Sequence, residues 1–423
     1  MKASDNRLIS DVTPGSAMNR AFKGFWLPVM HSKSLVADGA PIRFTICAEN
    51  YVAFRATDGR VAVFDELCPH RKCSLSLANN RDNALTCIFH GWKFDVSGKC
   101  VETPNEPNPK FPEKVPLKHY PCREAAGVLW VYLGKGAPSR FPDYLFNKLN
   151  EDQVLPRRAI VRCNWLTGFE GQIDPSHFAI LHQSWIKAAP DNSFNPDIER
   201  SAEHESLKIE FEDTGWGFRF AAIRDTPDGR KYVRTTEYVA PASAFIAASE
   251  STRKLFMMTV PIDNNTTAQW LFWYNPLGPI TPEVRSYAMG NSDPDDTDLF
   301  KDAKAKPMWG QDRQGMKEGK TFTGFNDIVI EDLVVQESMG PDLDRTKEFL
   351  CSADITVMRA RRYVLQRATR LEEGEERAFA HAEDFEYAAL QGIALTIEDT
   401  SRWREEAQAA MEERRRKFAS MTN

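Results

Sequence analysis

The chain has 423 residues, 42% of them hydrophobic, and a formal net charge of −6; a single core seldom serves so many residues, so we expect two domains. The negative charge argues against a nucleic-acid-binding protein, which needs a basic surface. The N-terminus is polar and lacks the apolar stretch of a signal peptide, and no run approaches the ~20 apolar residues of a transmembrane helix. We therefore expect a soluble cytoplasmic protein with no membrane partner.

The first third of the chain predicts a leading arm over residues 1–43 and a small all-β domain over residues 44–135. Between 44 and 66, short β-like runs are joined by a turn expected at Asp58–Gly59, and a further strand is indicated near 126–134. Five Pro within 103–116 predict a loop there.

Residues 136–423 predict a larger domain of a different kind. A helical stretch around 164–186 precedes alternating runs at 215–224, 231–240, 257–262 and 268–275, which predict strands. Helix is expected from about 327, and the final ~65 residues are charged and helix-favouring, with no Pro after Pro341. Strands flanked by long helices predict an α+β domain in which helices wrap an antiparallel sheet.

A compact group of Cys and His lies within the expected β domain. One residue separates Cys68 from His70 and two separate Cys87 from His90, so each of two loops offers one thiolate and one imidazole. Such a set binds either one zinc ion or a [2Fe–2S] cluster. Zinc fingers usually keep the Cys pair apart from the His pair, whereas here each arm is mixed. The pattern therefore favours a cluster with two Cys on one iron and two His on the other.

The spacing of these four residues, with Pro69 and the trailing Gly91–Trp92, resembles the Rieske family. The resemblance implies that Cys68 and Cys87 hold one iron of a [2Fe–2S] cluster and that His70 and His90 hold the other. A structural zinc site is the plain alternative. Cys73 follows His70, but no Cys lies beside His90, so a disulfide between the loops cannot form; we interpret Cys73 as a packed free thiol.

A second group of candidate ligands, Asp174, His177 and His182, follows in the larger domain. Two His and a carboxylate on one face of an iron, with open positions opposite, form the usual O₂-activating Fe(II) site. The two His are five residues apart, about 140° around an ideal helix, so both can face one metal only if the helix is kinked or carries a π-bulge. Asp174 is alternatively a helix N-cap before Pro175.

The pattern Asp-x₂-His-x₄-His resembles the signature of the Rieske ring-hydroxylating oxygenases. The resemblance implies that His177 and His182 bind iron, and that Asp174 links a cluster ligand of a neighbouring subunit to an iron-ligand His. The stretch 326–341 is similar to the phthalate dioxygenase branch, which implies Asp332 as the third ligand. On residue chemistry alone, three other acids remain open as ligands: Glu331, Asp327 and Glu337.

The resemblance covers nearly the whole chain, from residues 12–18 to residues 344–354. It implies an N-terminal Rieske domain joined to a helix-grip, START-like catalytic domain, with which the 1–43 arm associates. It implies a homotrimer or two stacked rings, in which the cluster of one subunit serves the iron of the next. It also implies a reductase partner that passes NADH electrons through FMN and a plant-type [2Fe–2S] centre, and O₂ and a small aromatic molecule as substrates.

The branch favours aromatic carboxylates, whose anionic group needs a buried cation or hydrogen-bond donors. The candidates are Arg219, Arg224, Arg234 and Ser184. A period of two along a strand places Arg224 on the face of Phe220 and Arg219 on the opposite face. The plain alternative for each arginine is an exposed side chain paired with an acid such as Glu237.

The sequence thus predicts the oxygenase component of a Rieske system that hydroxylates or dihydroxylates a phthalate- or benzoate-like carboxylate. A Rieske O-demethylase or monooxygenase of a methoxylated aromatic is the alternative among enzymes. Outside enzymes, the alternatives are a Rieske electron-transfer protein without a second iron and a zinc-stabilised interaction module, which would be colourless.

Overall fold

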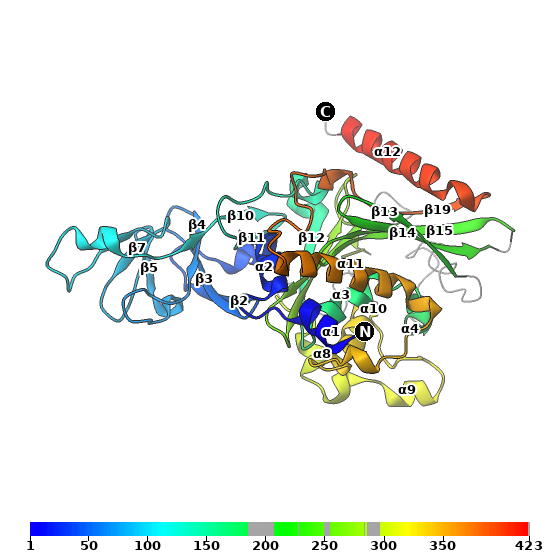
Figure 1. Ribbon diagram of the computed structural model, residues 1–423, viewed down its shortest axis with the longest axis horizontal. Helices are drawn as coiled ribbons and strands as arrows, with labels where there is room; N and C mark the ends of the chain where they lie inside the picture. Colours follow the sequence, from blue (N-terminus) through cyan, green and yellow to red (C-terminus); the bar gives the residue numbers. More distant parts are fainter. Residues whose placement is uncertain (185–206, 227, 249–253, 283, 286–296, 422–423) are drawn as a thin grey trace.

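The computed structural model describes residues 1–184, 207–226, 228–248, 254–282, 284–285 and 297–421. The last two residues of the helical stretch expected over 164–186 lie outside these ranges. Figure 1 shows an elongated molecule with small β-sheets at one end of its long axis and a large sheet with helices toward the other. The predicted fold class, an all-β domain joined to an α+β domain with an antiparallel sheet, is confirmed.

The all-β part consists of two four-stranded antiparallel sheets. One contains, in order, β2 (Ile42–Ile46), β3 (Glu49–Arg55), β4 (Val61–Asp65) and β9 (His119–Tyr120), and the other β5 (Asn79–Arg81), β6 (Ala84–Thr86), β7 (Lys93–Asp95) and β8 (Cys100–Glu102). Their apolar side chains share one core, in which Phe54, Phe64 and Phe94 are fully buried. The predicted turn at Asp58–Gly59 joins β3 to β4, and the φ of +88° at Gly59 explains the need for glycine there.

A three-stranded sheet joins the two parts of the molecule. It has the order β1 (Trp26–His31), β11 (Val128–Tyr132) and β10 (Cys122–Ala125). Trp130 of β11 stacks on Phe272 of the large sheet with ring centroids 5.5 Å apart, so the two sheets share a core. The leading helices α1 (Ala3–Ser10) and α2 (Ala17–Lys23) lie against the long helix α11 (Ile355–Glu372).

Among the described residues, the large sheet has eight strands, and all neighbours are antiparallel except β16 and β19. Their order is β12 (Val154–Val161), β18 (Thr267–Tyr274), β17 (Lys254–Pro261), β16 (Ser243–Ala248), β19 (Gly392–Ile397), β15 (Lys231–Val239), β14 (Gly217–Asp225) and β13 (Lys208–Asp213). The predicted strands of this region are therefore present.

Strand β19 corrects the expectation that the C-terminal region is helical throughout. Residues Gly392–Ile397 are mostly apolar and include three β-branched side chains, and they lie between β15 and β16 in the sheet. This strand is only six residues long and lies between two long charged helices in the sequence, so the composition of the whole region favours helix. Its pairing depends on strands more than 140 residues earlier, as the register Thr235↔Ile393 shows, and local propensity carries no such information.

Helices cover both faces of the large sheet. On one face lie α3 (Trp165–Ile173), α4 (Phe178–Leu181) and α10 (Ile328–Ser338), with the short helices α8 (Lys301–Lys304) and α9 (Arg313–Lys317) nearby. The C-terminal helix α12 (Trp403–Met421) lies along β19, and its Trp403 packs with Ala221 and Ile223 of β14. In the described part of the chain, no helix combines the length and the apolar character needed to cross a bilayer.

Candidate metal centres

The two Cys/His loops of the β domain have the same pattern of backbone hydrogen bonds. Cys68 N–H donates to the carbonyl of Cys73 at 2.9 Å, and Cys87 N–H donates to the carbonyl of Trp92 at 2.8 Å. The residue four positions after each Cys, Lys72 or Gly91, donates back to the Cys carbonyl at 2.9 Å. These two residues have φ of +61° and +73°. Equivalent tight turns therefore carry both Cys–His pairs to the same end of the domain.

The thiols of this group are buried and the imidazoles lie nearer the surface. Cys68 and Cys87 are 1% and 3% exposed. The rings of His70 and His90 lie 4.4 Å apart, and His70 stacks on Trp92 at 4.3 Å, which fixes its orientation. Nδ1 of His90 is buried and has no hydrogen-bond partner among the described residues. Such an atom suits a metal ligand, since a buried nitrogen without a partner is otherwise costly.

The spacing of the donors fits two metal ions better than one. A zinc ion with bonds of about 2.0–2.3 Å brings its ligand atoms within roughly 3.3–3.8 Å of one another. Among the described residues, only one set of three donor atoms lies within 4.8 Å of one another, and it is not this one. Burial raises the pKa of Cys68 to about 12, so a bound cation is what would hold it as a thiolate. Cys73 is a free, partly buried thiol.

The second candidate site begins where helix α3 ends. Asp174 has φ −85° and ψ 112°, an extended conformation that the following Pro175 favours, and it terminates α3 instead of capping a new helix. Its Oδ1 accepts hydrogen bonds from the backbone N–H and the hydroxyl of Ser176, both at 2.7 Å. His177 and His182 flank the single turn of α4. Instead of a kink or π-bulge within one continuous helix, α3 ends at Ile173 and α4 covers only Phe178–Leu181, so the two His lie at its two ends and both rings face one point.

Asp332, on α10, meets the two imidazoles at this point. Its Oδ1 lies 3.5 Å from Nε2 of His177 and 3.3 Å from Nε2 of His182. The three ligand atoms all lie within 4.8 Å of one another. Bonds of about 2.0–2.2 Å from one metal to N and O ligands place adjacent donors roughly 3 Å apart. The set therefore fits one ion bound on one face.

The other carboxylates considered from sequence have different contacts. Glu331 is fully buried, and its Oε2 accepts from Nδ1 of His182 at 2.7 Å, on the side of the ring away from Asp332. Asp327 caps α10 by accepting from two of its first backbone N–H groups. Glu337 accepts from the backbone N–H of Arg162 and the indole of Trp309. Of the four acids, only Asp332 faces Nε2 of both His.

Acidic groups dominate the electrostatics of this site. Burial raises the pKa of Asp174, but hydrogen bonds from His177 and Ser176 outweigh it, and the net shift is downward. Oδ2 of Asp174 lies 3.4 Å from Nδ1 of His177. Burial lowers the pKa of His182, yet Asp332 and Glu331 raise it to about 9. A divalent cation at the three ligand atoms would compensate this concentration of negative charge, so the residues fit a bound metal.

A cavity of about 200 Å³ opens from the His/His/Asp set into the space between α3, α10 and the large sheet. Its walls are mainly apolar and aromatic, including Phe178, Phe220, Leu255, Met257, Leu271 and Trp273. Residues on β14 and β15 with even numbers reach it, because side chains on a strand alternate between faces. The odd-numbered Ala221 and Ile223 instead pack under α12.

Two of the predicted arginines line this cavity. Arg224 is 2% exposed; its Nη2 donates to the Pro175 carbonyl at 3.2 Å, and its Nε is buried without an acceptor among the described residues. Burial and the positive charge of Arg234 lower the pKa of Arg224 to about 10. Arg234 lies over the ring of Phe178 at 5.0 Å and also reaches the cavity.

The other two candidates are not brought to the cavity. Arg219 is buried on the opposite face of β14, where it pairs with Glu237 and Glu212. The pairing with Glu237 agrees with the plain alternative considered from sequence, but the side chain is buried instead of exposed, and it is not part of the cavity wall. The hydroxyl of Ser184 accepts from the backbone N–H of Phe322 at 2.7 Å, and Ser184 does not line the cavity either.

Sequence reasoning missed three polar contacts. Glu331 was considered as a ligand and not as a hydrogen-bond partner of His182, although consecutive helix residues point about 100° apart and cannot present the same face. Thr323, whose hydroxyl donates to Glu331, gave no local signal. Gln336 lines the cavity and accepts from the amide of Gln269. Its place four residues after Asp332 predicts the same helix face.

Comparisons with known proteins agree with two metal centres in two separate parts of the chain. Residues 25–121 match the Rieske [2Fe-2S] domain, and residues 131–422 match the family described as LigXa C-terminal domain like. The first match covers the Cys/His loops and the second covers the His/His/Asp set. The chain is 33% identical to the phthalate 4,5-dioxygenase oxygenase subunit of Pseudomonas putida, over 88% of this chain and 87% of that protein.

Two further similarities support the same grouping. The chain is 31% identical to the 3-chlorobenzoate-3,4-dioxygenase oxygenase subunit of Comamonas testosteroni, over 86% of this chain and 87% of that protein. Among solved structures, the Pseudomonas putida CBB5 NdmA QL mutant with caffeine has a TM-score of 0.58 at 20% identity, covering 91% of this chain and 99% of that chain. At this identity the likeness concerns the fold alone.

Proposed function

The chain belongs to the Rieske non-heme iron oxygenases, in the phthalate dioxygenase-like branch, and on this premise we propose that it hydroxylates or dihydroxylates a small aromatic carboxylate with O₂ and NADH-derived electrons. Its cofactors are a Rieske [2Fe–2S] cluster and a mononuclear iron. When bound, these groups supply electron transfer and O₂ activation. The observation that carries the substrate class is the buried guanidinium of Arg224 in the cavity beside the iron site.

The geometry of the two sites supports the following ligands and positioning residues. The thiols of Cys68 and Cys87 and the imidazoles of His70 and His90 hold the cluster. His177, His182 and Asp332 hold the mononuclear iron, and Glu331 orients His182 through Nδ1. The domain boundaries are 1–43 for the arm, 44–135 for the Rieske domain and 136–423 for the catalytic domain.

An anionic substrate group accounts for the charge of the cavity. Among the described residues, no carboxylate pairs with Arg224, and its Nε lacks an acceptor. A buried guanidinium without an anion is costly, and a carboxylate matches its planar donor geometry. Arg234 adds a second positive charge on the same face of the sheet. The aromatic ring of the substrate then occupies the apolar part of the cavity, near Phe220 and Trp273, with one edge toward the iron ligands.

Asp174 links the iron site to the protein surface. Its Oδ2 faces His177, and its side chain is 20% exposed. Within one chain, the Rieske loops lie at the far end of the long axis from α3, α4 and α10 (Figure 1). A cluster on a neighbouring copy is therefore the better electron donor, and Asp174 is the group that its His ligand would contact.

Exposed apolar side chains near both ends of this route suit such an assembly. Around the cluster loops, the exposed residues are Leu67, Leu77, Ile88 and Phe89, and on the catalytic domain they include Ile180, Phe322, Phe349 and Ile355. Two different apolar patches on one chain suit a head-to-tail contact, and such a contact gives a ring when the rotation between neighbouring subunits closes. We expect a homotrimer or a stacked hexamer that receives its electrons from a flavin and iron–sulfur reductase.

A substrate screen tests the proposed reaction. The purified protein, with an NADH-dependent reductase, is supplied with phthalates, benzoates and methoxybenzoates, and substrate-stimulated NADH and O₂ consumption is measured. We expect stimulation and a hydroxylated product from at least one carboxylate and none from its methyl ester. Release of formaldehyde from a methoxybenzoate would instead identify an O-demethylase. A preparation with iron only in proportion to its sulfide would exclude a catalytic second iron.

A variant of Arg224 tests the substrate class. Losing a charge-assisted hydrogen bond costs about 1.5–3 kcal/mol, so Arg224→Gln should raise KM for the carboxylate roughly 10- to 150-fold. Arg230→Gln is the matched control, because Arg230 pairs with Asp228 at the exposed hairpin tip. An unchanged KM in Arg224→Gln would remove the proposed carboxylate site.

A variant of Asp174 tests the electron route. Asp174→Asn should keep both iron centres yet nearly abolish coupled turnover, since Asp174 is not a ligand and lies 3.4 Å from Nδ1 of His177, a longer contact than the 2.7 Å bond of Glu331 to His182. The measurement is product formed per NADH consumed, together with iron and sulfide content. Turnover like that of the wild type would remove the bridging role and leave the substrate assignment intact.

A further inference from the structure

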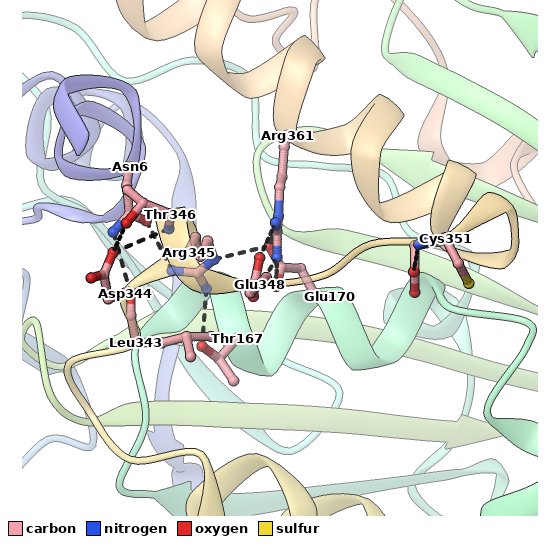
Figure 2. Close-up of polar contacts among 11 residues, drawn as sticks. Asn6, Thr167, Glu170, Leu343, Asp344, Arg345, Thr346, Glu348, Cys351 and Arg361 are labelled. Carbon is pink, nitrogen blue, oxygen red and sulfur yellow. Dashed lines mark hydrogen bonds and ion pairs between the residues drawn. The ribbon is translucent and has the colours of Figure 1, made fainter. Parts of the chain in front are cut away.

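A buried network of charged side chains lies outside both metal sites (Figure 2). Its Glu170 is four residues, about one helical turn, before Asp174. At its centre, the guanidinium of Arg361 on α11 contacts two carboxylates. Nε and Nη2 donate to the two oxygens of Glu170 at 2.7 and 2.9 Å, and Nη1 and Nη2 donate to the two oxygens of Glu348 at 2.5 and 3.1 Å. Arg361 is 5% exposed, so the contacts are shielded from solvent.

A second arginine balances the charge of the network. Arg345 is 2% exposed; it donates to Thr167 Oγ1 at 3.0 Å and to Asn6 Oδ1 at 3.3 Å, and its Nε lies 3.4 Å from Glu170 Oε1. Two arginines thus face two glutamates. Buried ion pairs seldom add stability over apolar side chains of similar volume. We therefore attribute to these ion pairs a role in fixing the relative positions of the segments that carry them.

The network connects helix α3 with the segment that follows α10. Glu170 belongs to α3, which ends four residues later at Asp174. Glu348 belongs to the segment that follows α10, the helix of Asp332. Immediately after Glu348, the side chains of Phe349 and Leu350 are exposed at 102% and 42%. One guanidinium therefore holds both the helix that ends at Asp174 and an exposed apolar turn.

We propose that Arg361, through Glu170 and Glu348, is a positioning residue that holds Asp174 and the Phe349–Leu350 turn in one fixed relation, so that a neighbouring cluster meets Asp174 at the right distance. This inference rests on the proposed function, in which Asp174 receives electrons from another subunit. A displacement of about 1 Å at a reacting group is enough to lower a rate by roughly 100-fold. Without the network, α3 and the turn can move independently.

The experiment compares two pairs of variants in the assembled holoenzyme. Glu170→Gln and Arg361→Lys weaken the network while keeping side-chain shape or charge. Glu237→Gln and Arg219→Lys weaken a similar buried ion cluster on the large sheet, which contacts neither Asp174 nor the turn. The cluster is reduced in advance, substrate and O₂ are added, and the rate at which the Rieske absorbance returns is measured with iron content and Tm.

We expect Glu170→Gln and Arg361→Lys to slow cluster reoxidation at least tenfold with full iron content, and the two control variants to stay within about twofold of the wild type at a similar loss of Tm. Wild-type reoxidation in the network variants would overturn the proposal, as would equal slowing in the controls. Slow reoxidation in the wild-type enzyme with every substrate would instead count against the proposed function. If one network variant fails to fold, the other decides the result.

Discussion

The hydrogen bond between Glu331 and His182 allows a quantitative test of the iron site. The two side chains are 0% and 1% exposed, and Oε2 accepts from Nδ1 at 2.7 Å. The substitution Glu331→Gln keeps the shape of the side chain but removes its charge and weakens the control over the ring. Loss of such an outer hydrogen bond typically lowers metal affinity 10- to 100-fold, or about 1.4–2.7 kcal/mol.

The assay is competition for Fe(II) between the protein and a chelator, with the Rieske absorbance recorded to show that the cluster is retained. Glu337→Gln is the matched control, because Glu337 lies on the same helix and contacts Arg162 and Trp309 but neither His. We expect weaker iron binding in Glu331→Gln only. Iron affinity within twofold of the wild type, or an equal loss in Glu337→Gln, would refute the reasoning.

Three further predictions concern the rest of the chain. Burial lowers the pKa of Lys254 from 10.5 to about 7. Between these two pH values the unfolded state binds more protons than the folded state, so the free energy of unfolding should rise with pH by up to ~1.4 kcal/mol per unit. Lys254→Met should remove this slope in urea unfolding. A Cβ at Gly217 would lie 2.3 Å from the Tyr238 carbonyl oxygen, whereas one at Gly215 would meet nothing within 4 Å; Gly217→Ala should therefore cost about 1–3 kcal/mol in thermal unfolding, and Gly215→Ala almost nothing. Cys73→Ser should keep full iron and sulfide content, because four other residues supply the cluster ligands; loss of colour would identify Cys73 as part of the cluster site.

The strongest predictions from sequence concern residues close together in the chain. The Cys/His loops are short turns whose spacing specifies their own geometry, and the structure builds both loops alike. The period of two along β14 places Arg219 and Arg224 on opposite faces from sequence alone, because alternation belongs to the strand itself.

Other features cannot be predicted from short segments of the sequence. Which face of β14 looks into the cavity depends on α3 and α10, which cover one side, and on α12, which covers the other. The identity of the third carboxylate depends on where α10 lies, since Asp327, Glu331, Asp332 and Glu337 all share one short stretch of sequence. Strand β19 was predicted as helix, because its partners are distant and its surroundings are charged.

The sequence by itself determined the two kinds of metal chemistry, since the types and spacings of the Cys, His and Asp residues are properties of short segments. Only the tertiary structure decided which acid meets both imidazoles, which arginine is buried in the cavity and which is paired away from it. Those outcomes depend on contacts between segments more than 100 residues apart, such as His182 with Glu331. Packing of whole elements, and not local preference, sets such distances.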